Sequence, residues 1–400
     1  MTRLTRMARR SWSDSDEAAA RGSKAIRRRS STTTRVSPKA PVIEMAEQDS
    51  STLEKKPQTG PGHGGASNPV ANAVRRILPK SYLIFVLVAI IVIGSAVAPD
   101  FLSVRNANNV VAYSAIIAVL AIGEFFVILT GGIDLSVGSI LAMSTVISAL
   151  TLKTGMSAGL SVILTLGVCA LAGFINGVLV VWLRIPPFIA TLAMLSLVKG
   201  LSYIIQSRSL IQISDHAFVQ AFSSGVTLGV HNPVLIFIVV AIVAAFVTKY
   251  TTFGRRLYAI GGNPEAARLS GLPVHRDLLI TYTVSGLLAG LAGMIAAAQL
   301  LQGSSLIGTG YELDAIAAVV VGGASLMGGT GDPLSAVIGV FILAAIINMM
   351  NLVGISSEPQ LVIKGAVIVI AVFLSSAGGV QRISAWGSKL FGRRNAAAAD

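Results

Sequence analysis

Charged side chains inside apolar stretches are the first candidates for chemistry in this chain. Three charged residues lie within long apolar runs and three acids lie at the ends of such runs: Glu124, Lys199, Lys364, Asp134, Asp314 and Asp332. A charge placed in hydrocarbon is costly, so such residues are candidates for a functional site. Ion coupling is one hypothesis, in which buried acids carry a proton or a sodium ion. Against it, only Glu124 is well inside a run, since both lysines are near enough to run ends to reach water.

Catalytic and cofactor chemistry is not predicted. The sequence suggests no Ser/His/Asp or Cys/His arrangement, and the four histidines are scattered without metal-ligand spacing. No G-x-x-x-x-G-K-[ST] phosphate loop occurs, so if ATP drives this protein, another chain must bind it. We therefore expect no enzyme and no cofactor in this chain. The single Cys169 lies in an apolar run and is expected to be a packing residue.

The segment from Leu129 to Ser139, LTGGIDLSVGS, is unusually polar for an apolar chain. Gly131 and Gly132 can unwind the backbone, and Asp134 can cap a helix that follows. It is either a helix end that points into a translocation path or a tight turn with Asp134 as its cap. Further polar residues are candidates for such a path or, alternatively, for bonds between helices: Glu124, Asn176, Glu312, Asp314, Asn348 and Asn351.

Composition predicts an all-α polytopic membrane protein. The mean hydropathy is +0.75, 53% of residues are hydrophobic and 12% are charged. Apolar runs of about 17–25 residues recur, which is the length that crosses a bilayer. We predict ten spans, at residues 81–98, 110–130, 134–152, 158–181, 187–206, 233–249, 278–301, 313–330, 333–353 and 360–376. The eighth is the weakest because two Gly-Gly pairs interrupt it, which predicts a broken or short helix.

Small residues and helix order suggest how the spans are arranged. Gly173-x-x-x-Gly177 and Gly286-x-x-x-Gly290 each place two glycines on one helix face, which allows close helix packing. Spans two to five and seven to ten form two sets of four with opposite orientation. Weak similarity between the two sets, around Asp134 and Asp314, is of the kind that inverted repeats leave.

Basic residues predict the orientation. Ten Lys/Arg fall on the side of Arg184, of the 249–277 loop and of the C-terminal tail 377–400, against three on the other side. The rule that basic loops stay inside puts both termini in the cytoplasm.

The transmembrane domain is predicted to span 77–376, and residues 1–76 form a basic tail expected to be disordered. Lipid or nucleic-acid binding by this tail is less favoured than a solvated extension, and translation from Met45 is a further possibility.

The polar loop at 249–277 contains a second candidate site. Within it, Glu265-Ala266-Ala267 is followed four residues later by Gly271. Glu265 would lie in the first turn of a short helix, where a negative charge suits the helix dipole, and Gly271 could end that helix. A second protein could bind at this loop.

Four motifs resemble the membrane permeases of bacterial ribose-type monosaccharide ABC importers. They are LTGGIDLSVGS (129–139), PPFIATL (186–192), GGNPEAARLSG (261–271) and GTGYELDAIAAVVVGGASLMGG (308–329), and the similarity runs from about Ile77 to Leu374. Branched-chain amino acid permeases share the wider superfamily, but GGIDLSVGS favours the sugar branch. The long basic tail departs from the family's usual short N-terminus.

The resemblance implies a set of partners and a location. These are a second permease subunit, expected as a homodimer, a tandem-domain cytoplasmic ATPase, a periplasmic sugar-binding protein and the bacterial inner membrane; no nucleic acid is expected. The resemblance also implies that a short helix docks on the ATPase through Asn263, Pro264, Glu265, Ala266, Ala267, Arg268 and Gly271. Ribose or a related pentose is the expected substrate. The alternatives are an ion-coupled secondary transporter and a membrane-embedded enzyme or scaffold.

Overall fold

The computed structural model describes residues 69–207 and 209–375. The predicted tails and the alternative start at Met45 lie outside these residues, except that the first helix begins inside the N-terminal tail, at Pro69. Side chains are described from Tyr82 to Phe373, except at 208 and 371.

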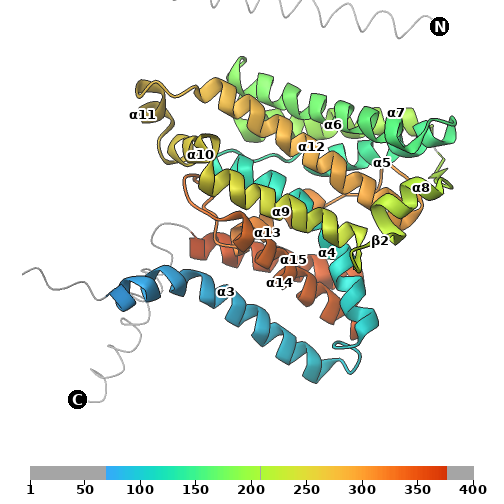
Figure 1. Cartoon of the computed structure of the whole chain (residues 1–400), viewed down its shortest axis with the longest axis horizontal. Helices are drawn as coiled ribbons and strands as arrows, with labels where there is room; N and C mark the ends of the chain where they lie inside the picture. Colours follow the sequence, from blue (N-terminus) through green and yellow to red (C-terminus); the bar gives the residue numbers. More distant parts are fainter. Residues whose placement is uncertain (1–68, 208, 376–400) are drawn as a thin grey trace, which may run out of the picture. The chain divides into compact units, whose positions relative to one another are not determined.

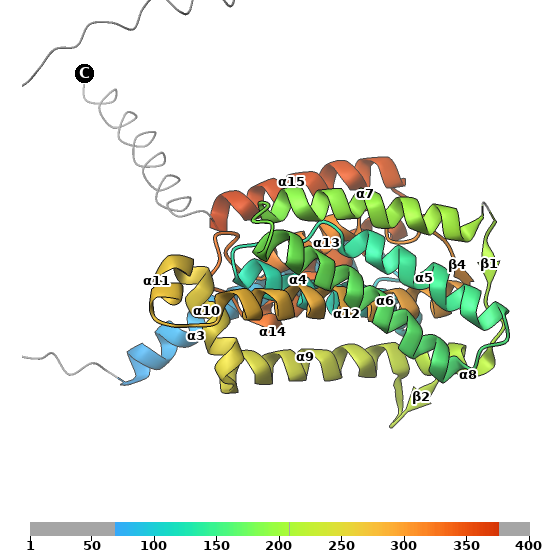
Figure 2. The ribbon, with the colours of Figure 1, turned by 90° about the horizontal axis from the view of Figure 1, so that it is seen from above.

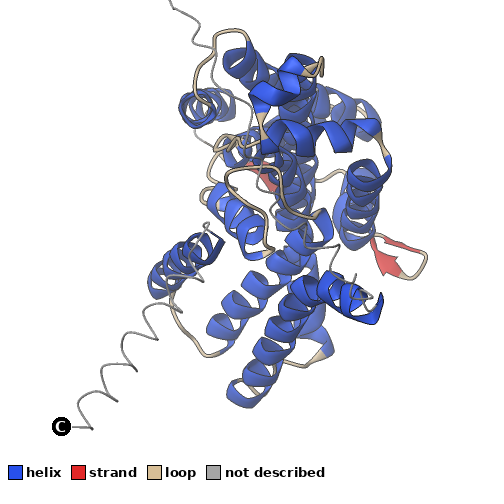
Figure 3. Ribbon diagram, turned by 90° about the vertical axis from the view of Figure 1, so that its left-hand side faces the viewer, coloured by secondary structure: helices blue, strands red, loops and turns tan. Residues whose placement is uncertain are grey.

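Helices form most of the described chain (Figures 1 and 3). In chain order they are α3 (Pro69–Val97), α4 (Val104–Leu129), α5 (Val137–Lys153), α6 (Ala158–Val181), α7 (Pro187–Gln206), α8 (His216–Val219), the π-helix η2 (Gln220–Ser224), α9 (Asn232–Tyr250), α10 (Thr252–Gly262), α11 (Pro264–Leu269), α12 (Val274–Leu300), α13 (Tyr311–Val321), α14 (Pro333–Leu352) and α15 (Ser357–Ser375). Two short antiparallel pairs complete the fold: β1 (Ile211–Gln212) with β4 (Gln302–Gly303), and β2 (Val226–Thr227) with β3 (Val230–His231).

Long apolar helices confirm a polytopic membrane protein. Within residues 69–207 and 209–375, six helices are long and apolar enough to cross a bilayer: α4, α6, α7, α9, α12 and α14. Two shorter apolar helical stretches are Tyr82–Val97 of α3 and the whole of α5. Each of the ten predicted spans contains a helix, and Pro187 begins α7 as its position after Pro186 suggests.

The eighth predicted span is a half-length helix followed by a loop. α13 has 11 residues and ends at Val321, directly before Gly322. At 1.5 Å per residue it is about 17 Å long, roughly half of a hydrocarbon core. Residues 322–332 therefore form a loop, so no helix fills the whole range 313–330, and the predicted short helix is confirmed.

Buried small residues hold the centre together. Every residue of α4 from Ser114 to Leu129 is buried, because α9, α12, α13 and α14 all pack around it. α6 packs on α12 where Gly173 meets Gly286, so closely that a Cβ added to Gly173 would lie 3.0 Å from the Gly286 Cα. The predicted packing role of these glycine motifs is confirmed, and Cys169 is a buried free thiol beside them.

The two ends of the helices carry different elements. α10 and α11 lie at one end, and α8 with the strand pairs lies at the other (Figure 2). In both predicted sets, α4–α7 and α12–α15, the second helix is the shortest, with 17 residues in α5 and 11 in α13.

Candidate functional site

A network of buried polar side chains surrounds the loop between α4 and α5. Its members come from three helices and this loop, and we call them the Asp134 network: Glu124 of α4, Asp134 and Ser136 of the loop, Asn176 of α6 and Ser285 of α12. All five are at most 1% exposed. The helices that converge here position every member, because α12 packs against both α4 and α6.

Hydrogen bonds in the network converge on the Asp134 carboxylate. Oδ1 accepts from the Ser136 backbone N–H at 3.0 Å, from the Ser136 hydroxyl at 2.6 Å and from Asn176 Nδ2 at 3.4 Å. Oδ2 accepts from the Ser285 hydroxyl at 3.2 Å. Asn176 Nδ2 also donates to Ser136 Oγ at 2.7 Å. Four donors therefore satisfy a carboxylate that has no access to water.

Glu124 is tied to the same loop through the backbone. Its Oε1 accepts from the Asp134 N–H at 3.0 Å, whereas its Oε2 is buried and has no partner in the described part of the chain. The Oδ1 of Asn176 is a second buried oxygen with no partner among the described residues. Two unpaired acceptors beside a charged network could bind a hydroxyl donor, such as water or a sugar hydroxyl.

The predicted capping role of Asp134 is wrong. The N-cap position of α5 is occupied by Ser136. Asp134 lies two residues before that position, and its carboxylate accepts a hydrogen bond from the Ser136 N–H. The backbone carbonyl of Ile133 is held by the Thr191 hydroxyl of α7 at 3.0 Å. The loop is thus fixed by four helices, which goes beyond a tight turn.

Glu312 and Asp314 lie in the first turn of α13. Asp314 forms a 2.6 Å ion pair with Lys364 of α15, so Lys364 binds an acid rather than only reaching toward water. Glu312 lies against Gly138 at the start of α5, and Lys199 Nζ donates to Thr309 close by at 3.5 Å. This second group of charges connects α7, α13 and α15.

The remaining asparagine candidates lie elsewhere and have partners. Asn348 of α14 and Asn106 of α4 exchange side-chain hydrogen bonds of 2.7 and 2.8 Å. Asn351 Oδ1 of α14 accepts from Gln360 Nε2 of α15 at 2.7 Å. Both contacts match the alternative interpretation of a bond between helices.

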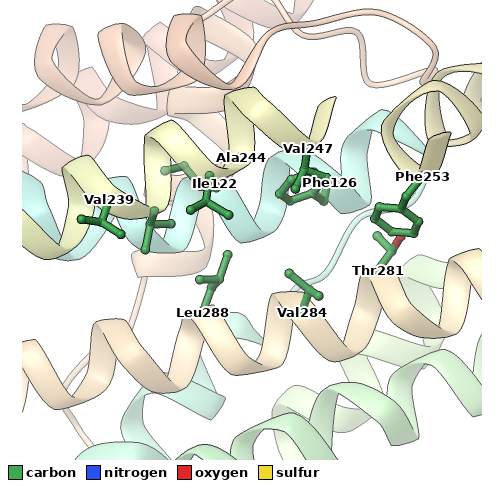
Figure 4. Close-up of a pocket in the computed structure, with 11 residues that line it drawn as sticks. Ile122, Phe126, Val239, Ala244, Val247, Phe253, Thr281, Val284 and Leu288 are labelled. Atoms are coloured by element: carbon green, nitrogen blue, oxygen red, sulfur yellow. The ribbon is translucent and has the colours of Figure 1, made fainter. Parts of the chain in front are cut away.

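Two cavities differ in the chemistry of their walls. A cavity of about 750 Å³ lies where α7 ends and is lined by Tyr203, Gln206, Ser304 and Ser305 among others; Gln206 Oε1 accepts from Ser305 N–H at 2.7 Å. The other, of about 310 Å³, lies between α4, α9 and α12 (Figure 4). Its lining is apolar except for Thr281, whose hydroxyl donates to the Asp277 carbonyl. Only the first offers hydrogen-bond partners to a polar solute.

The docking segment predicted at 263–271 is a six-residue helix, α11, with a cap at each end. Asn263 accepts from the Ala266 N–H at 3.0 Å, and Glu265 is in the first turn as predicted. The chain leaves through Gly271 at φ +78, with the Leu272 N–H bonded to Ala267 O, which confirms the predicted stop. Ala267 is the one buried residue of α11.

Charges on α11 are exposed and paired within one turn. The Arg268 guanidinium donates twice to Glu265, at 2.6 and 3.1 Å, and thereby lowers the pKa of that carboxyl below its ordinary value. A carboxyl with a lowered pKa stays ionised at neutral pH and loses the pairing only as the pH falls through that pKa. Next to α11, Arg256 of α10 forms two bonds to the buried Asp277 of α12, at 2.6 and 3.1 Å.

Comparison with known proteins assigns the chain to a family. The family described as "Branched-chain amino acid transport system / permease component" matches residues 106–372. The chain belongs to this permease family. Ribose import permease RbsC of Escherichia coli (strain K12) is 39% identical over 310 residues, which cover 76% of this chain and 97% of that protein. RbsC of Bacillus subtilis (strain 168) is 42% identical, over 72% of this chain and 90% of its own.

Other permeases are similar over the same part of the chain. The D-allose transport system permease AlsC of Escherichia coli (strain K12) is 36% identical, over 72% of this chain and 86% of its own. No solved structure matches the chain at a significant level. Permeases of this kind are transport subunits, so this chain is a permease and not an enzyme.

Sequence reasoning missed several polar residues of this permease. Ser136 and Ser285 bond to Asp134, and Gln206 bonds to Ser305, but none was a candidate. The only signal in the sequence is a single hydroxyl or amide residue among apolar ones. Many such residues bond only within their own helix, as Thr283 does by donating to Leu279 O.

Proposed function

We propose that this permease imports a monosaccharide, ribose or a related pentose, across the bacterial inner membrane with energy from ATP. The two relatives above with the highest identities are named as ribose permeases, and the third is named as a D-allose permease. The observation that carries the proposal is α11: a capped helix with an exposed ion pair, at the end of the bundle and held to it through Ala267. Such a helix fits a groove on a second protein.

The proposed arrangement in the membrane has ten spans and two inverted sets of four helices. The half-length α13 would be one of the ten. Both termini and the 249–277 loop would face the cytoplasm, since they carry the basic residues. The domain from 77 to 376 would carry the transport function between two cytoplasmic tails.

The proposed partners follow from that orientation. A cytoplasmic ATPase with two tandem domains would bind ATP and receive α11, while this chain would hold no cofactor. A second copy would complete the path. A periplasmic sugar-binding protein would dock on 207–232 and 302–312, two segments joined by the β1–β4 pair.

The proposed path connects the two polar regions. Sugar would enter near the cavity beside Gln206 and Tyr203, pass the charged residues of α13 and reach the level of the Asp134 network. Hydroxyls of the sugar need donors and acceptors at each stage, which the apolar cavity beside α9 does not offer.

Two substitutions in α11 test the docking role. Glu265→Lys reverses the charge in the first turn, and Gly271→Trp places a side chain at a left-handed position. We expect both to abolish ATP-driven sugar uptake in proteoliposomes while insertion into the membrane is kept. Gly155→Trp is the matched control, because Gly155 has φ +84 and also meets no neighbouring atom, but lies at the opposite end. Normal uptake in both α11 variants would refute the docking role.

A vesicle assay separates this proposal from ion coupling. Uptake that requires ATP and continues in the presence of an uncoupler supports the importer. Uptake that continues without ATP and stops with the uncoupler would instead show a secondary transporter, with Glu124 as the first acid to substitute.

A further inference from the structure

Two loops and one helix meet close to the docking segment. The Gly329 N–H, in the loop after α13, donates to the carbonyl of Leu129 at the end of α4 at 2.9 Å. The Tyr258 hydroxyl of α10 donates to the carbonyl of Gly331 at 2.8 Å. The end of α4 is therefore joined to the loop after α13 by a backbone hydrogen bond, and α10 is joined to the same loop by the Tyr258 hydroxyl.

Glycine makes this close contact possible. A Cβ on Gly261 of α10 would collide with the carbonyl oxygen of Leu129 and the nitrogen of Gly329. A Cβ on Gly328 would lie 2.7 Å from the nitrogen of Gly131 and 3.0 Å from the Gly261 Cα. We call Gly131, Gly261, Gly328 and Gly329 the glycine junction. Its parts touch through main-chain atoms, so one cannot move along another without displacing it.

The junction lies between the two candidate sites. On one side, Asn263 ends α10 and caps α11, so α11 begins three residues after Gly261. On the other side, Gly131 is three residues before Asp134, whose carboxylate accepts the bonds of the network. One route of covalent bonds and contacts from α11 to Asp134 therefore runs through Gly261, Gly328 and Gly131.

We propose that the glycine junction transmits movement of α11 to the Asp134 loop, with Gly261 as its positioning residue. This inference rests on the proposed function, since α11 is taken as the part on which the ATPase acts. Displacement of α10 by the ATPase shifts Leu129 and Gly329 together, and these carry the loops after α4 and after α13. Asp134 then moves relative to Asn176 and Ser285, which belong to other helices.

Two neighbouring glycines provide a matched test. Gly261→Ala introduces a Cβ into the junction, whereas a Cβ on Gly262 meets no atom within 4 Å. Both residues are in α10, so the change in helix propensity is the same. The complete transporter in proteoliposomes is assayed for sugar uptake, for ATP hydrolysis stimulated by the binding protein and for thermal stability.

The expected result is uncoupling in one variant only. Gly261→Ala should lower sugar transported per ATP hydrolysed by about tenfold or more, a coupling effect typical between distant sites. Gly262→Ala should retain the wild-type ratio. Equal ratios in both variants and the wild type would overturn the proposal, as would an equal loss in both, since that would show an effect of helix propensity.

A milder variant decides the question if Gly261→Ala fails to assemble. Tyr258→Phe removes only the hydroxyl that binds Gly331, and should lower the transport-to-hydrolysis ratio severalfold at unchanged thermal stability. An unchanged ratio of transport to hydrolysis would then overturn the proposed role of the junction. Failure of the proposed function looks different: wild-type uptake would not need ATP, and Glu265→Lys would have no effect.

Discussion

Acidic residues serve opposite purposes in the Asp134 network and in α11. The Asp134 carboxylate is fully buried and accepts hydrogen bonds from side chains of α6 and α12. Glu265 has a side chain that is 64% exposed and pairs with Arg268 three residues later. One acid holds distant helices together, and the other is held within a single turn.

This difference predicts how each region responds to substitution. A buried polar group that loses its partner retains the full cost of its desolvation, whereas an exposed ion pair contributes little to stability. Substitutions in the network should therefore reduce folding stability first. Substitutions in α11 should change transport and leave the fold intact.

Asp134→Ala should have the largest effect on stability. The substitution leaves the Ser285 hydroxyl and the Ser136 donors buried without their acceptor, at about 1–3 kcal/mol for each unpaired group. We expect a loss on the order of 3–5 kcal/mol, seen as a strongly lowered thermal midpoint in detergent by tryptophan fluorescence. A midpoint equal to that of the wild type would contradict the structural role of the network.

Asn348→Leu should have an intermediate effect and tests a predicted path residue. It breaks the reciprocal pair with Asn106, at about 1–3 kcal/mol, because the Asn106 amide then loses a partner. The double variant Asn106→Leu with Asn348→Leu should lose less stability than the sum of the single variants. Normal sugar uptake by the double variant would assign the pair to helix packing. Loss of uptake at normal stability would instead support Asn348 as a residue of the translocation path.

Thr191→Val should have a smaller effect on stability. It removes the hydroxyl that holds the Ile133 carbonyl at 3.0 Å while it preserves the size of the side chain. The expected loss is about 1 kcal/mol, a typical value for one hydrogen bond. The thermal midpoint measures it, with Thr283→Val as the control because that hydroxyl bonds only within its own helix.

Arg268→Ala should have the smallest effect on stability and a clear effect on docking. The residue is exposed, so removal of its ion pair should leave the thermal midpoint unchanged. Binding of the purified ATPase should weaken, as measured by co-purification of the two chains. A lowered midpoint would show that α11 is part of the folded core and would remove the contrast between the two regions.

The sequence by itself determined the helices and the position of the short helix α11. Long apolar runs predict spans because the bilayer leaves few other ways to satisfy backbone hydrogen bonds. Local patterns were equally informative: Asn263 caps α11, Glu265 is in its first turn and Gly271 takes the left-handed conformation after it. These features depend on residues a few positions apart, so the sequence contains all that they need.

Only the tertiary structure decided which polar residues meet. Ser285 and Asp134 are 151 positions apart, and Asn106 and Asn348 are 242 apart. Helical periodicity says which residues share a face, but the neighbour of that face depends on how all the helices pack. For the same reason Asp134, which the sequence suggested as a cap for the helix that follows it, instead binds side chains of α6 and α12. The glycine junction was hidden too, because glycines that touch across three segments look in the sequence like separate turns.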